Sequence, residues 1–376
     1  MRLPLSIAAL LLLAGSACAQ PRAAEAQADA PASGRIDWEI EPSGRDGHVQ
    51  LEISRRSGNS HWTIGRTVAL SSLDGLGEAQ LAGNGGPIAF RLARDAGTLS
   101  CEGVARRGRG TGDCSFAADA RFAAALAERG SGRPTANEQF SMALHDIGYS
   151  YIEELERQRY ETPSATDLAR AGDHGVTFDY LRGMGAHGYR VGRLALLITM
   201  RDHGVDPEYV AALARLGVRD IPPAEIVRLR DHGITPDYVG ELRQLGYPGL
   251  STDAMIRLRD HGVTADYVRT LARHGISDIP PDELTRLRDH GVMPDFVAAL
   301  REHGYGGFST AEIVRMRDHG VDGDYVAALR RLGYTGLSAE EIVRLRIHGV
   351  DADFIRRVNG RDRLTPEELV RLRIGG

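Results

Sequence analysis

The sequence predicts an α+β multidomain protein, in which a small antiparallel β domain precedes an α-helical solenoid with two short helices in every repeat. Two observations carry this prediction. From Arg35 onwards, apolar and polar residues alternate with a period of two, as expected for strands of a sheet with one polar face. After Ala117, aromatic, histidine and glycine residues recur at every 29th position, which is typical of a solenoid.

Residues 1–19 have the pattern of a signal peptide. Arg2 precedes an apolar stretch that is too short to span a bilayer, and small residues end this stretch before Gln20. We therefore expect an exported protein, periplasmic or secreted, with residues 20–33 as a disordered linker. In the alternative interpretation, Cys18 carries a lipid anchor. No later segment is long and apolar enough to predict a transmembrane span.

The β domain is predicted to cover residues 34–117, because short alternating segments in this region are separated by clusters of Gly, Asn and Asp. The candidate strands lie at residues 36–40, 49–53, 61–68, 88–93, 97–105 and 112–117.

Two cysteines flank the predicted turn at Arg107 and Gly108. A symmetric hairpin places Cys101 opposite Cys114, and an exported chain meets an oxidising compartment, so we expect a disulfide between them. Two buried free thiols are the alternative. A metal site is disfavoured because no histidine or third cysteine lies nearby in sequence.

Residues 118–376 are predicted to form about eight of these repeats. The aromatic series begins at Phe122 and Tyr151 and continues at every 29th residue to Phe354, and we expect it to lie in the core. Histidine and glycine form the rest of the repeat frame. Its members are His174, His203, His232, His261, His290, His319 and His348, each followed by Gly175, Gly204, Gly233, Gly262, Gly291, Gly320 or Gly349.

One repeat shows how the local sequence predicts two helices. Thr235 is a candidate N-cap with Pro236 at the first helical position, and Gly246 follows the last apolar position. The second helix is expected to begin after Ser251 and to end at Gly262. Helices this short are unstable alone, so stacked neighbours must bury their apolar faces in a shared core.

The repeated Asp-His and Arg residues are candidates for chemistry. We favour a structural role for the histidines, capping helix ends and stacking along the array, over a row of metal ligands. We expect the arginines to pair with Asp231, Asp260 and their equivalents, and an anion-binding stripe is the alternative. Motifs for catalysis or phosphate binding are missing from the sequence, so we expect no enzyme, no cofactor and no metal site.

Function is expected to lie on the repeat surface, where some positions vary while the frame stays fixed. Glu241, Arg269, Thr270 and Ala298 are examples, and we take them as a candidate ligand surface for a protein or peptide partner. A metal- or anion-binding protein using the His and Arg rows is an alternative. Export and the near-neutral charge of each repeat disfavour nucleic acid as a partner.

Two segments of the repeat region, residues 228–239 (RLRDHGITPDYV) and 257–268 (RLRDHGVTADYV), carry a resemblance to known proteins. They are similar to tandem helical repeats of exported bacterial proteins, including repeats that lie C-terminal to membrane metallopeptidases of the β-lactam-sensor type. The peptidase motif of those proteins is missing here, so their activity is not implied. The resemblance implies an extracytoplasmic scaffold or, alternatively, the sensor or regulatory module of an envelope signalling or peptidase system.

Overall fold

The computed structural model describes residues 35–57, 60–359 and 363–375. The predicted signal peptide, the linker and Cys18 lie outside these residues. The chain divides into two compact units. The first unit reaches residue 157 and includes residues 161–173, and the second holds residues 158–160 and the chain from residue 174 onwards. The boundary between the units therefore lies beyond residue 118, where the sequence period changes.

A six-stranded antiparallel sheet forms most of the first unit. All six strands lie where the alternating pattern predicts them. Their bounds are β1 Arg35–Pro42, β2 His48–Ser57, β3 Ser60–Ala69, β4 Gly86–Arg94, β5 Gly97–Arg106 and β6 Arg109–Ala118, in the spatial order β3-β2-β1-β6-β5-β4. Alternate residues of β1 are buried at Ile36, Trp38 and Ile40, and this face forms the core of the sheet.

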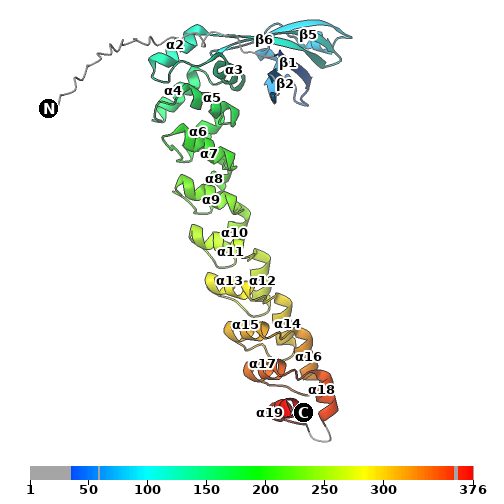
Figure 1. The fold of residues 1–376 in the computed structure, drawn as a ribbon. Coiled ribbons are helices and arrows are strands. Elements are labelled where there is room, and N and C mark those ends of the chain that lie inside the picture. Colours follow the sequence, from blue (N-terminus) through cyan, green and yellow to red (C-terminus); the bar gives the residue numbers. More distant parts are fainter. Residues whose placement is uncertain (1–34, 58–59, 360–362, 376) are drawn as a thin grey trace, which may run out of the picture. The chain divides into compact units, whose positions relative to one another are not determined.

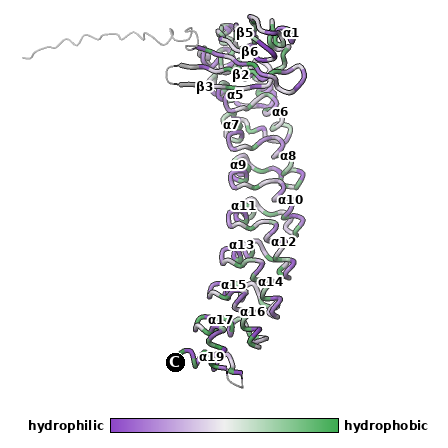
Figure 2. The backbone as a smooth tube through the Cα atoms, turned by 90° about the vertical axis from the view of Figure 1, so that its right-hand side faces the viewer, coloured by the Kyte–Doolittle hydropathy of each residue, from purple (hydrophilic) through white to green (hydrophobic). Residues whose placement is uncertain are grey.

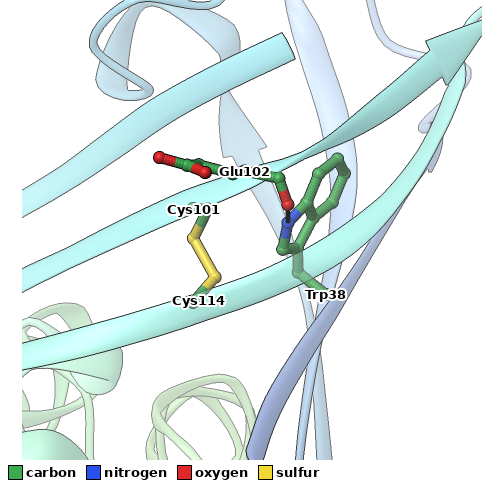
Figure 3. The surroundings of a disulfide bond; sticks show 4 residues. All are labelled: Trp38, Cys101, Glu102 and Cys114. Atoms are coloured by element: carbon green, nitrogen blue, oxygen red, sulfur yellow. Dashed lines mark hydrogen bonds between the residues drawn. A yellow bond between two sulfur atoms is a disulfide. The ribbon is translucent and has the colours of Figure 1, made fainter. Parts of the chain in front are cut away.

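A disulfide joins the paired strands β5 and β6. Cys101 lies directly opposite Cys114, and Leu99 lies opposite Phe116, which is the register that the symmetric hairpin predicts. The indole N–H of Trp38, on β1, donates a hydrogen bond to the carbonyl of Glu102, on β5, at 3.1 Å (Figure 3). These contacts tie together the three adjacent strands β1, β6 and β5.

Short helices complete the first unit. They are α1 Glu78–Ala82, α2 Ala120–Glu128, α3 Ala136–His145, α4 Tyr149–Arg157 and α5 Ala165–Asp173. Phe122 of α2, the first aromatic of the repeat series, is fully buried. The side-chain amide of Gln139 in α3 donates to the carbonyls of Ala96 and Asp119 at 2.9 and 2.8 Å, so α3 is fixed to the chain next to the sheet.

Two rows of helices form the second unit (Figures 1 and 2). Their bounds are α6 Phe178–Ala186, α7 Leu194–Asp202, α8 Pro207–Arg215, α9 Pro223–Asp231, α10 Pro236–Gln244, α11 Thr252–Asp260, α12 Ala265–Arg273, α13 Pro281–Asp289, α14 Pro294–Glu302, α15 Thr310–Asp318, α16 Gly323–Arg331, α17 Ala339–Ile347, α18 Ala352–Val358 and α19 Pro366–Gly375. Each even-numbered helix contacts the next even-numbered helix, and the odd-numbered helices likewise follow one another. This is the predicted solenoid.

The helices end at glycines and begin at N-cap residues, as the sequence predicts. After α11, Gly262 has a φ of 71°, and its N–H bonds to the carbonyl of Arg259 while the N–H of Val263 bonds to the carbonyl of Leu258. This pair of bonds satisfies the free carbonyls of the helix end and requires a left-handed residue. At the helix starts, Thr235 accepts a hydrogen bond from the N–H of Tyr238, as predicted for an N-cap.

Candidate functional site

The aromatic series lies in the core, as predicted, and it also joins the two rows of helices. Tyr238 of α10 is 5% exposed, and its hydroxyl donates to the carbonyl of Val263, just after the end of α11, at 2.8 Å. The same bond recurs at Tyr180, Tyr209, Tyr267 and Tyr325. Each accepting carbonyl belongs to the residue that follows a helix-ending glycine. One polar atom in an apolar core is thereby satisfied at each of these junctions.

Burial keeps these phenols in the protonated, donating form. It raises the pKa of Tyr209, Tyr238 and Tyr267 to about 12, because the buried tyrosinate would lose its hydration. The nearby guanidiniums oppose this rise but are the smaller effect. A phenol with such a pKa is unsuited to act as an acid or base near neutral pH.

The histidines pair with aspartates one repeat further along the chain, and not with the aspartates that precede them in sequence. Nδ1 of His232 lies 2.8 Å from Oδ1 of Asp260. The equivalent pairs are His174–Asp202, His203–Asp231, His261–Asp289 and His290–Asp318. Stacking is therefore the role that these contacts support. The bonds from imidazole to helix carbonyls that we expected at the helix ends are replaced by these bonds between repeats.

The arginine row makes different contacts from those expected. Arg259 of α11 lies over the ring of Tyr238 of α10, 5.2 Å from its centroid, and its equivalents make the same contact. The other arginine of the row, Arg257, pairs with Asp282 at 2.7 Å. The predicted pairing of the row with Asp231 and Asp260 is wrong, because the histidines of the preceding repeats hold these carboxylates.

These contacts also bear on the alternative of a metal-binding row. Across the described ranges 35–57, 60–359 and 363–375, no three His, Cys, Asp or Glu side chains are grouped so that they could hold a metal ion. Each imidazole of the five pairs meets one carboxylate, and a zinc site in a protein needs at least three protein ligands. The five pairs form a ladder of single contacts between neighbouring repeats.

The residues taken as a candidate ligand surface lie along the even-numbered helices. Glu241 is on α10, Arg269 and Thr270 are on α12, and Ala298 is on α14. Glu241 and Arg269 face each other, with 3.7 Å between carboxylate and guanidinium. A hollow of about 510 Å³ lies between α8 and α10 beside Glu241. Its lining residues are Ala212, Arg215, Leu216, Pro236, Asp237, Gly240, Glu241 and Gln244.

A second cavity, of about 340 Å³, lies nearer the loops that join the two rows of helices, and it was not predicted from the sequence. It is lined by Gly217, Val218, Arg219, Ile221, Val239, Leu242, Arg243, Tyr247, Gly249, Leu250, Ser251, Thr252 and Met255. The sequence does contain a signal for this cavity. Arg219 and Arg243 are both arginines, and no equivalent pair of positions in the other repeats has two arginines.

Comparison with known proteins assigns no relative: no protein-family model matches the chain, and no curated protein matches it. The helices in the described part of the chain include none that is both long and apolar enough to cross a bilayer.

Proposed function

We propose that the protein is an exported, non-enzymatic binding or scaffold protein of the cell envelope that holds a protein or peptide partner on the even-numbered helices of its solenoid. The observation that carries the proposal is the hollow between α8 and α10, which lies beside two residues, Gly240 and Glu241, at positions that vary from repeat to repeat. A disulfide in the first unit supports the proposed export, because such bonds persist in oxidising compartments.

The chemistry of this hollow suits a peptide better than a small apolar ligand. Arg215 lies on one wall, Asp237 and Glu241 lie on the other, and Pro236 and Leu216 add apolar surface. Both signs of charge are therefore offered beside carbon atoms, as in the rims of many protein interfaces. Gly240 contributes no side chain to this wall. The space that its Cβ would occupy has Leu216 as its nearest neighbour, at 3.7 Å.

The contacts between repeats explain why the proposed binding surface is already ordered before a partner binds. Along the array, the five His–Asp pairs and the buried apolar residues fix the helices, while the outward positions are free to differ. A surface that is already ordered loses less conformational entropy on binding.

The test uses selection of peptides from a random library displayed on phage, with the whole oxidised chain as the target. We expect enriched peptides to bind at least tenfold more weakly to a chain carrying Glu241→Arg. Asp253→Ala, a substitution in α11 of the other row of helices, is the matched control and should leave binding unchanged. Failure to enrich any peptide, or equal binding by the Glu241→Arg chain, would overturn the proposal.

A further inference from the structure

The 340 Å³ cavity has an uneven lining. Val239, Leu242 and Met255 are buried and give it an apolar floor, at 4%, 1% and 2% exposure. Two exposed arginines, Arg219 and Arg243, also line it, and no carboxylate is among the described residues that do so. A space of this size falls at the small end of the range for ligand sites, so it suits a compact group rather than a long segment.

Both arginines are available to a ligand. Nε of Arg219 donates a hydrogen bond to the carbonyl of Ala214 at 2.8 Å. This bond positions the guanidinium and does not use its two terminal nitrogens. The guanidinium of Arg243 lies against Gly217, 3.4 Å from the point that a Cβ would occupy there. Among the described residues, neither arginine has a carboxylate within ion-pair distance. The carboxylate of Glu225, which is not among the lining residues, already accepts hydrogen bonds from Arg228 and from the lining residue Thr252.

The arginine pair is confined to this junction of the array. The equivalent pairs of residues are Arg190 and Ala214, Pro248 and Ala272, Ser277 and Arg301, Gly306 and Arg330, and Thr335 and Asn359. A role in the repeat frame would require the pair at every junction. Its restriction to one junction is instead what a local binding site requires.

We infer that this cavity binds the terminal carboxylate of a peptide whose last side chain is apolar. This inference rests on the proposed peptide-binding function and gives it a second, end-recognising site. Arginine presents a planar fork of donors that matches a carboxylate. The apolar floor below the two guanidiniums accepts the side chain next to that carboxylate, and its burial adds to the affinity.

The experiment measures fluorescence anisotropy of a labelled peptide that ends in alanine and leucine, titrated with the whole chain. The same peptide with a terminal amide, in place of the free acid, should bind at least tenfold more weakly. A chain with both Arg219→Gln and Arg243→Gln should lose the same factor for the free acid. Arg301→Gln, at the equivalent position of the junction two repeats further on, is the matched control and should bind normally.

A carboxylate beside an apolar group could come from a small apolar acid or from a peptide terminus. Competition with unlabelled N-acetyl-leucine distinguishes these two sources. Displacement of the peptide by this small acid would show that a carboxylate with one apolar group suffices. If the labelled peptide stays bound in the presence of N-acetyl-leucine, and its free-acid form still binds more tightly than its amide form, a peptide terminus is required. Circular dichroism of each variant checks that the exposed arginines are not needed for folding.

Two results would overturn the inference. One is equal binding of acid and amide, and the other is unchanged binding by the double arginine variant. The proposed function fails separately, because its test depends on Glu241. Peptides that bind as acid and amide alike but are lost with Glu241→Arg would leave the even-helix surface standing and remove only the carboxylate site.

Discussion

The imidazole of His232 lies 2.8 Å from the carboxylate of Asp260, which is 28 residues away, although Asp231 is its neighbour in sequence. Asp231 in turn accepts His203 from the repeat before. The Asp231-His232 dipeptide therefore contacts the preceding repeat through Asp231 and the following repeat through His232. A motif that suggests a local catalytic pair is, in the folded chain, a link between neighbouring repeats.

We expect His232→Ala to lower the free energy of unfolding by about 0.5 kcal/mol, because the pair is about two-fifths exposed and such pairs are weak. His319→Ala is the matched control. In the repeat after His319, Ile347 stands at the position of the pairing aspartate, so no carboxylate is available there. Urea unfolding followed by circular dichroism measures both changes, and equal losses in the two variants would contradict the ladder. Ile347→Asp should add a pair and raise the stability by a few tenths of a kcal/mol.

We expect Gly262→Ala to destabilise the repeat array by about 1–2 kcal/mol, because its φ of 71° is unfavourable for a residue with a Cβ. Gly240→Ala is the opposite case. Gly240 lies inside α10, and its Cβ would have 3.7 Å to the nearest heavy atom. This substitution should be neutral or stabilise by up to about 0.5–1 kcal/mol. The midpoint of thermal unfolding should fall for Gly262→Ala and stay unchanged or rise for Gly240→Ala, and an unchanged midpoint for Gly262→Ala would refute the role assigned to Gly262.

Alkaline pH should destabilise the array between about pH 10 and 12. In the unfolded chain a tyrosine ionises near pH 10, whereas burial raises the pKa of Tyr209, Tyr238 and Tyr267 to about 12. In this window the unfolded state binds fewer protons than the folded state, so the free energy of unfolding falls as pH rises. Below pH 10 these phenols contribute no pH dependence.

The sequence helps this measurement, because it contains no lysine whose titration would overlap that of tyrosine. A chain with phenylalanine at positions 209, 238 and 267 should show a shallower loss of stability across the same window. A slope unchanged by these three substitutions would show that other groups cause the alkaline transition.

Reduction of the disulfide should destabilise the first unit by about 2–4 kcal/mol and leave the helical array unchanged. Both tryptophans, Trp38 and Trp62, belong to strands of the sheet, so their fluorescence reports on the first unit. Circular dichroism at the helical bands reports mainly on the solenoid. We expect a thiol reductant to lower the stability of the first unit, measured by tryptophan fluorescence, and to leave the unfolding of the solenoid, measured by circular dichroism, unchanged. A chain with Cys101→Ala and Cys114→Ala should behave like the reduced protein and show no further response to the reductant.

The local structure could be predicted from the sequence because its causes are local. The strands follow from alternation, the hairpin register from the turn at Arg107 and Gly108, and the helix ends from glycines such as Gly262 that need a left-handed backbone. These features depend on residues within a few positions of one another. A single sequence contains that information.

The contacts between repeats could not be predicted in the same way, because they depend on how far one repeat is rotated and shifted against the next. The sequence shows that Arg259 and Asp260 recur, but not that Arg259 lies over Tyr238 while Asp260 meets His232. The cavity at Arg219 and Arg243 was missed for the same reason, since its walls come from segments that are separated by a whole helix in the sequence. The reach of the first unit to residue 173 likewise reflects tertiary packing, because α5 packs against α3, which contacts β5 and β6.

Because the recurring contacts come from a few neighbouring residues in each repeat, they have a consequence for how the length of such a chain can change. Arg259, Asp260 and Val263 make the three recurring contacts to Tyr238 and His232 earlier in the chain, and most repeats carry the equivalent residues. Ile347, in place of an aspartate, is an exception. If residues 233–261 were excised, His232 would meet Asp289 in place of Asp260, and Tyr209 would donate to the carbonyl of Val263 in place of Ile234. Gene duplication or loss in units of one repeat therefore preserves the spacing on which these recurring contacts depend, whereas an insertion of another length disrupts that spacing at one junction. Such a protein can be lengthened or shortened by recombination while its fold is inherited intact.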